Sequence, residues 1–229
     1  MRALRRISYG IIVAVLAITV AILPVERTTS AACGAQSSLC GLESVLSLPS
    51  ELSSVTAPNV VTPDWLKPKT TFTYVVETRG TITADLAQFK SLANETLNDS
   101  RGWSRLDIRF TEVSSGGSFT LVLSEASEVP GFSPTVCSTT YSCRVGRYVI
   151  INQDRWLGAS DPWNAASGSL RDYRNMVINH ETGHWLGHDH QHCGGTGQSA
   201  PVMQQQSIDL EGCKFNPWPL DSELWSSRL

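Results

Sequence analysis

The first periodic segment of the chain alternates apolar and polar residues from Thr71 to Thr78. A period of two residues is typical of a strand with one buried face, and Phe72, Tyr74 and Val76 form its apolar side. We therefore expect the folded domain to begin near this strand.

A helical period replaces the alternation after a possible cap at Thr83. The apolar residues that recur at the spacing of one helix face are Leu86, Phe89, Ala93 and Leu97. Polar residues and a glycine at 98–102 interrupt this pattern, so the sequence predicts a helix of about four turns.

Two further alternating runs follow this helix. Their apolar residues are Leu106, Ile108 and Phe110 in the first run, and Phe119, Leu121 and Leu123 in the second. Because Gly116 and Gly117 lie between the runs, the two predicted strands could form a hairpin.

Two longer patterns complete the domain. The continuous apolar run at 148–151 is typical of a strand that is covered on both faces. Helical spacing then extends from Leu170 to Leu186, and Gly187 is well placed to end that helix in the left-handed conformation. The order strand, helix, strands, helix predicts an α/β (α+β) fold, in which helices pack on a mixed sheet.

The N-terminal part of the chain differs in composition from this domain. Three arginines precede an apolar run at 9–23, whose length of about 15 residues is typical of a signal peptide. Extended to 7–25, the run approaches the length of a membrane span. Residues 1–32 are therefore interpreted as a signal peptide or an N-terminal membrane anchor, residues 33–70 as a Ser- and Pro-rich spacer, and residues 71–229 as the domain.

Charge and cysteine content narrow the function classes. The net charge is -3, and no basic run follows the first few residues, so we expect no nucleic-acid partner. Six cysteines fit an oxidising compartment, and the predicted protein is either secreted or tethered to the outer face of the cytoplasmic membrane. The simplest of several possible pairings joins Cys33 with Cys40, Cys137 with Cys143, and Cys193 with Cys213.

The strongest chemical signal is the position of the histidines, since all five lie between residues 180 and 192. His180 and His184 are four residues apart, so a helix presents both imidazoles on one face with Glu181 beside them. A turn at Gly187 would let His190 approach the same ion from another direction.

Three protein ligands leave one position of a zinc ion open, which is the arrangement of a catalytic site. We therefore predict Zn²⁺ as the cofactor and a zinc-bound water as the nucleophile, with Glu181 as the general base. His188 lies four residues after His184 and could compete as a ligand if the helix continued past Gly187, but His188 and His192 are expected in solvent or supporting roles. Asp189 could orient a ligand histidine, or it could be an exposed carboxylate in the turn.

The pattern from His180 to His190, HExxHxxGxxH, resembles the extended zinc motif of metzincin peptidases. That resemblance implies a metzincin-like twisted mixed sheet packed on an N-terminal helix and a zinc-binding active-site helix. It also implies a methionine turn beneath the metal, for which Met203 is the natural match.

A closer resemblance covers residues 71–219 and points to an uncharacterised actinobacterial family of exported zinc-dependent proteases. The segments that carry it, besides the zinc motif, are Arg101-Gly102-Trp103, Pro201-Val202-Met203-Gln204-Gln205-Gln206 and Asn216-Pro217-Trp218-Pro219. This resemblance implies a zinc peptidase without indicating its substrate.

One departure from better-known metzincins affects the expected chemistry. No tyrosine follows Tyr173, so the tyrosine that some metzincins place after the methionine turn is absent. Stabilisation of the transition state would then depend on zinc and on other hydrogen-bond donors.

The sequence favours a monomeric endopeptidase whose protein or peptide substrate lies extended along an edge strand. Two alternatives stay open: a zinc-stabilised, non-catalytic binding module of the cell envelope, and a hydrolase for amide bonds in cell-wall peptide.

Overall fold

The computed structural model describes residues 68–229. The predicted signal peptide or anchor, nearly all of the predicted spacer, and the pair Cys33 and Cys40 lie outside these residues. Among the helices of residues 68–229, none has the length and apolar character needed to cross a membrane.

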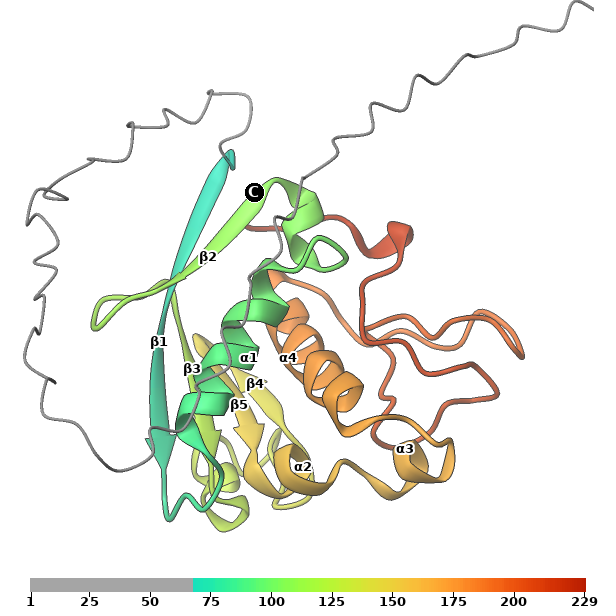
Figure 1. Ribbon diagram of the computed structural model, residues 1–229, viewed down its shortest axis with the longest axis horizontal. Helices are drawn as coiled ribbons and strands as arrows, with labels where there is room; N and C mark the ends of the chain where they lie inside the picture. The colour runs from blue at the N-terminus through green and yellow to red at the C-terminus, as the bar shows by residue number, and fades with distance from the viewer. Residues whose placement is uncertain (1–67) are drawn as a thin grey trace, which may run out of the picture. The chain divides into compact units, whose positions relative to one another are not determined.

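The described residues contain one five-stranded mixed sheet with the order β2-β1-β3-β5-β4. Every neighbouring pair is parallel except β4 and β5, so β4 is an antiparallel edge strand (Figure 1). The strands are β1 (Thr70–Arg79), β2 (Ile108–Glu112), β3 (Phe119–Ser124), β4 (Cys143–Val145) and β5 (Tyr148–Asn152).

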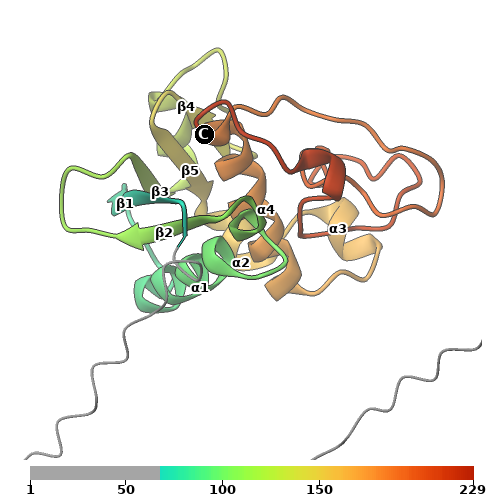
Figure 2. The same cartoon turned by 90° about the horizontal axis from the view of Figure 1, so that it is seen from above.

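The two longest helices pack against each other on one face of this sheet (Figures 1 and 2). The α-helices are α1 (Leu86–Asn98), α2 (Gln153–Gly158), α3 (Asp161–Ala165) and α4 (Leu170–Leu186). Three short 3-10 helices cover Trp103–Leu106, Ala126–Gly131 and Asp221–Glu223. The mixed α+β class predicted from the sequence is therefore confirmed.

The central strands are buried on both faces because two separate hydrophobic clusters cover the sheet. Leu121 and Val149 belong to the large cluster on the side of α1 and α4. Val122 and Ile150 belong to a smaller cluster that includes Cys143 of β4 and its disulfide partner Cys137. This arrangement explains the continuous apolar run in β5, since each face of the strand needs an apolar side chain.

The predicted hairpin between the second and third strands is wrong. Both strands run parallel to β1, and β1 lies between them. The chain leaves β2 where Glu112 pairs with Tyr74, crosses over β1, and enters β3 where Phe119 pairs with the same Tyr74. A Cβ at Gly117 would lie 2.9 Å from the Tyr74 Cα, so this glycine permits the crossing. The chain therefore keeps its direction and does not reverse.

Both long helices begin at side-chain caps. The cap of α1 is Asp85, whose carboxylate accepts two backbone N–H bonds, whereas Thr83 contacts Gln153 instead. Helix α4 begins after Ser169, which accepts the Asp172 N–H. It ends at Gly187 with φ 111°, as the sequence predicts.

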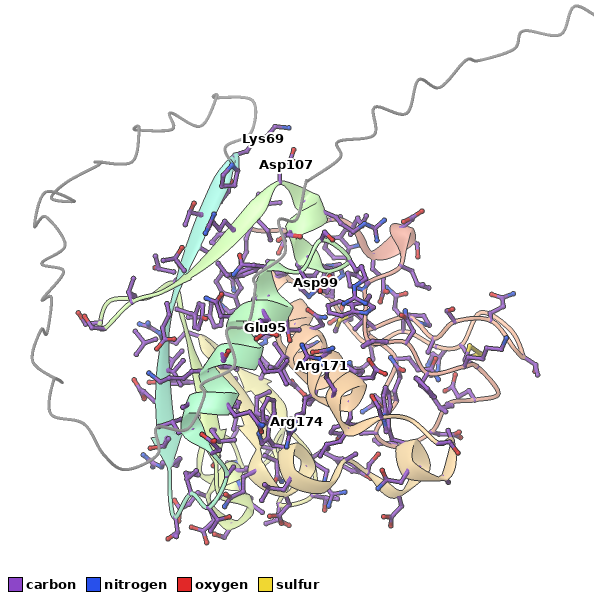
Figure 3. The ribbon with its side chains drawn as sticks, in the orientation of Figure 1. Lys69, Glu95, Asp99, Asp107, Arg171 and Arg174 are labelled. Carbon is purple, nitrogen blue, oxygen red and sulfur yellow. A yellow bond between two sulfur atoms is a disulfide. The ribbon has the colours of Figure 1, made fainter. Side chains whose placement is uncertain are left out.

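Polar contacts also join the two helices. Thr96 of α1 donates to the Asn175 side chain of α4 in a buried hydrogen bond of 2.9 Å. On the surface, Glu95 and Arg171 form an ion pair of 2.8 Å between the same helices (Figure 3). Exposed pairs contribute little to stability, so the buried bond and the apolar contacts hold α1 against α4.

Candidate metal centre

Helix α4 carries the predicted metal ligands on its last two turns. His180 and His184 are one turn apart on the helix, and their ring centroids are 4.8 Å apart. At Gly187 the chain reverses, and the His188 N–H donates to the Gly183 carbonyl at 3.0 Å. This helix end is the turn that the sequence predicts, and it directs the following residues back toward the helix.

The reversal brings His190 to the other two histidines. One ring nitrogen from each of His180, His184 and His190 lies within 4.8 Å of the others. The Nε2 atoms of His184 and His190 are 3.0 Å apart. Nitrogens that bind one zinc ion tetrahedrally at about 2 Å are separated by roughly 3.3 Å, so this cluster fits a metal ion. The sequence-predicted ligands are therefore together, and they can hold a metal.

Backbone carbonyls set the orientation of two of these rings. His180 Nδ1 donates to the Val202 carbonyl at 2.8 Å, and His184 Nδ1 donates to the His188 carbonyl at 2.8 Å. Each bond leaves the Nε2 lone pair free for a cation.

Burial keeps these imidazoles in the form that binds metal. It lowers the pKa of His180 to about 3 and that of His184 to about 4. His190 is exposed at its outer side, but desolvation of its ring by the neighbouring residues still lowers its pKa. All three rings are therefore neutral at pH 7, as metal ligands must be.

Glu181 is buried beside the ligands and has a free oxygen. Its side chain is 5% exposed, and within residues 68–229 its Oε2 has no hydrogen-bond partner. Burial raises the pKa of Glu181 to about 8, although the positive charge of Arg144 opposes that shift. A cation bound by the neighbouring histidines would favour the ionised carboxylate, so the unpaired oxygen itself fits a metal site.

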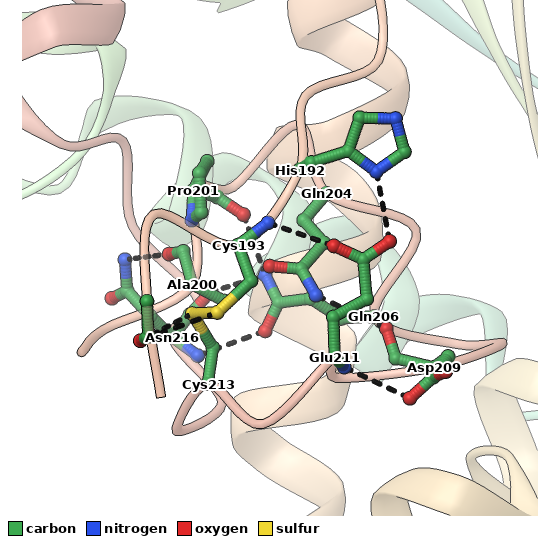
Figure 4. Close-up of a disulfide and its surroundings, with 11 residues drawn as sticks. His192, Cys193, Ala200, Pro201, Gln204, Gln206, Asp209, Glu211, Cys213 and Asn216 are labelled. Atoms are coloured by element: carbon green, nitrogen blue, oxygen red, sulfur yellow. Dashed lines mark hydrogen bonds and ion pairs between the residues drawn. A yellow bond between two sulfur atoms is a disulfide. The ribbon is translucent and has the colours of Figure 1, made fainter. Parts of the chain in front are cut away.

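The other two histidines have different surroundings. His188 is buried between the rings of Trp103 and Trp225 and donates to the Trp225 carbonyl at 2.9 Å. It therefore supports the site through packing and through its own carbonyl, as one of the predicted alternatives states. His192 is exposed and pairs with Glu211 (Figure 4).

Asp189 is exposed, and no hydrogen bond of its carboxylate to another described residue is seen. This position agrees with the turn alternative and not with a role in orienting a ligand histidine.

Met203 lies beneath the ligand-bearing helix. Its side chain is fully buried, and a Cβ at Gly183 would be 2.3 Å from its sulfur, so the two segments touch at that glycine. The buried carboxylate of Glu223 accepts the N–H groups of Val202 and Met203, each at 2.9 Å. Sequence reasoning missed Glu223, because a single acidic residue in the irregular C-terminal segment follows no pattern.

A cavity of about 300 Å³ opens beside the histidines. One wall is the preceding turn of α4, with Met176 and Val177, and another is the segment at 205–208 that follows Met203. The third wall comes from β4 and the loop before it, including Arg144. A molecule in this cavity would therefore contact Glu181 and the three clustered histidines.

Two disulfides border the site, as the simplest pairing predicts. Cys137 and Cys143 close the loop at the third wall, and Cys193 and Cys213 close the segment that contains Met203 (Figure 4). Two intact disulfides indicate an oxidising environment for this domain.

The sequence from residue 55 to residue 217 matches the family described as "Protein of unknown function (DUF3152)". This match covers more than half of the chain. The chain belongs to the DUF3152 family. Among curated proteins, none matches it. The DUF3152 description names no activity.

The DUF3152 match contains every residue that we expect to bind metal, together with Glu181 and Met203. Three residues beyond it nevertheless complete the site. Glu223 holds the turn at Met203, Trp225 packs on His188, and the Arg228 guanidinium donates to the Trp185 carbonyl near the end of α4. The C-terminal segment thus belongs to the same structural unit (Figure 2).

Proposed function

We propose that this protein is an extracytoplasmic zinc-dependent peptidase. The observation that carries the proposal is the convergence of three neutral imidazoles and one unpaired buried carboxylate in an open cavity. When bound, zinc supplies Lewis acidity and lowers the pKa of water. The resemblance of the motif to that of metzincins supports the same reaction class.

Each residue has a defined task in this proposal. His180, His184 and His190 hold the zinc, and backbone carbonyls keep the first two rings oriented. Glu181 accepts a proton from the attacking water and later delivers it to the leaving amine. Met203 packs under the helix and supports the ligands without taking part in proton transfer.

The edge strand β4 is our candidate for the substrate-binding strand. It pairs only with β5 within residues 68–229, and its residues Cys143 and Arg144 line the cavity. An extended peptide added to this edge would lie beside the cavity that Glu181 lines, and backbone hydrogen bonds would hold the peptide independently of its sequence. We propose that the enzyme acts as a monomer that is either secreted or tethered to the membrane.

The test compares the full-length protein with its Glu181→Gln variant. We expect zinc in both by metal analysis, because all three imidazoles remain. Cleavage of a broad peptide library should fall by about 10²-fold or more, since an amide cannot accept the proton. Glu95→Gln, which changes an exposed carboxylate on α1, is the matched control and should leave cleavage intact.

Two outcomes would contradict the proposal. Equal cleavage by wild type and Glu181→Gln would remove Glu181 from the reaction. Zinc binding by the wild type without cleavage of any peptide would favour the alternative of a non-catalytic binding module of the cell envelope.

A further inference from the structure

Arg144 is a charged residue in the cavity wall that the proposed reaction does not use. It is the middle residue of β4, and neighbouring side chains of a strand point to opposite faces of the sheet. Cys143 belongs to the small cluster on the face away from α4. Arg144 lies opposite Val149, whose side chain packs in the large cluster beneath α4. The guanidinium group therefore lies on the same face as the metal ligands.

The charge of Arg144 has no counter-ion within residues 68–229. Its guanidinium forms no ion pair within 4.0 Å with a carboxylate of these residues, and its Nε is buried without a hydrogen-bond partner. Among the residues that line the cavity, Glu181 is the single carboxylate, and its proposed role is proton transfer. The positive charge of Arg144 also contributes, after burial, to the lowered pKa of Arg228. The wall beside the histidines is therefore cationic, and within residues 68–229 no carboxylate is in ion-pair contact with it.

A buried N–H group without a partner costs free energy that a ligand can recover. The guanidinium fork matches a carboxylate in geometry, because two parallel N–H bonds can reach its two oxygens. Polar side chains on the same walls, including those of Ser138, Tyr141 and Gln205, can hydrogen-bond a carboxylate that enters the cavity. The cavity volume of about 300 Å³ also leaves room for an acidic side chain.

We propose that Arg144 is a specificity-determining residue that binds a carboxylate of the substrate close to the scissile bond. The carboxylate belongs either to an Asp or Glu side chain or to the C-terminus of the peptide. This inference rests on the proposed peptidase function and adds a substrate class to it: peptides with an acidic group beside the cleaved bond.

The experiment uses matched peptides with the zinc-loaded full-length protein. One pair differs by Glu or Gln next to the cleaved bond, and a second pair differs by a free or an amidated C-terminus. We expect the wild type to prefer one carboxylate member by about tenfold or more in kcat/KM, mainly through KM, as suits a charge-assisted hydrogen bond. The pair that shows the preference identifies the source of the carboxylate.

Substitution of Arg144 should remove that preference. In Arg144→Gln the ratio of kcat/KM for the carboxylate peptide to kcat/KM for the amide peptide should fall to about one. Arg144→Lys keeps the charge and should retain part of the wild-type preference. Arg109→Gln, at an exposed arginine of β2, is the matched control and should keep the wild-type ratio. Equal loss on all peptides through kcat would overturn the proposal, because it would place Arg144 at the developing oxyanion.

A binding measurement separates this inference from the peptidase proposal. Both peptide pairs are labelled for fluorescence anisotropy with zinc-loaded Glu181→Gln protein. In one pair the carboxylate peptide should bind about tenfold more tightly than its amide counterpart, and Arg144→Gln in that background should abolish the difference. If wild type cleaves nothing but this preference is found, the peptidase proposal fails and the carboxylate site stands. Absence of any preference overturns the site, whether or not peptides are cleaved.

Discussion

At the scale of single residues, the direction of each ring nitrogen decides which histidines can bind metal. His180 and His184 use Nδ1 for backbone carbonyls and keep Nε2 free. His188 uses its Nε2 for the Trp225 carbonyl, and its ring lies between two indoles. His190, which follows the helix end at Gly187, is thus the proposed third ligand, whereas His188 is packed between two indoles.

This difference predicts a ranking of two alanine variants. His190→Ala should weaken zinc affinity by at least about 10²-fold and abolish cleavage, because a ligand is lost. His188→Ala should weaken zinc affinity by no more than about tenfold, since its backbone carbonyl still accepts the His184 bond.

Zinc titration against a competing chelator measures both affinities. His188→Ala should also lower the melting temperature, because a buried ring is removed, and circular dichroism provides that check. The reverse order of zinc affinities would contradict the assignment of His190 as the third ligand.

At the scale of elements, the metal centre depends on how helix α4 and the turn at Met203 contact each other. The turn lacks regular secondary structure, so its N–H groups need other acceptors. Glu223 provides them for Val202 and Met203, and it also accepts the Leu220 N–H at 2.8 Å. One buried carboxylate therefore joins the C-terminal segment to the residue whose carbonyl orients His180.

Glu223→Ala should destabilise the protein and loosen the metal site. Several buried N–H groups would lose their acceptor, at a cost of about 1–3 kcal/mol for each unsatisfied group. Zinc affinity should fall about tenfold, because the Val202 carbonyl would no longer be held against His180. Urea unfolding and zinc titration measure the two effects.

Ser222→Ala, at an exposed neighbouring position, is the control and should change neither quantity. Unchanged stability together with unchanged zinc affinity in Glu223→Ala would show that the turn holds its position without this carboxylate.

At the scale of the whole molecule, the sheet, the helices and two cross-linked loops enclose the cavity from different sides. The Cys193–Cys213 disulfide joins two cysteines that are 20 positions apart, and the segment between them contains Met203. The Cys137–Cys143 disulfide joins two cysteines that are 6 positions apart beside the cavity, and the segment between them contains none of the three clustered histidines. The two cross-links should therefore affect different properties.

Replacing Cys193 and Cys213 with alanine should lower the free energy of unfolding by about 3 kcal/mol. Replacing Cys137 and Cys143 with alanine should lower it by about 2 kcal/mol, because a disulfide that closes a shorter loop removes less entropy from the unfolded chain. The first change should also weaken zinc binding, whereas the second should mainly weaken peptide binding. Urea unfolding, zinc titration and anisotropy measure these effects. Weaker zinc binding in the Cys137 and Cys143 variant alone would contradict this division.

The sequence by itself determined the local parts of this protein. The helical period predicted the helix from Leu170 to Leu186 and placed His180 and His184 on one face of it. The conformational freedom of glycine predicted the helix end at Gly187. Both effects act over a few residues. The cysteine pairs at 137–143 and 193–213 followed from proximity in the chain.

The tertiary structure alone decided which distant segments meet. The chain crosses β1 at Tyr74, so β2 and β3 run parallel, although Gly116 and Gly117 resemble a hairpin turn in sequence. Arg144 lies beside the histidines only because β4 pairs with β5 at the sheet edge. Glu223 contacts the turn at Met203 only because the C-terminal segment returns to that turn. Periodicity indicates which face of an element is apolar, but strand order and loop paths depend on the summed burial of the whole chain.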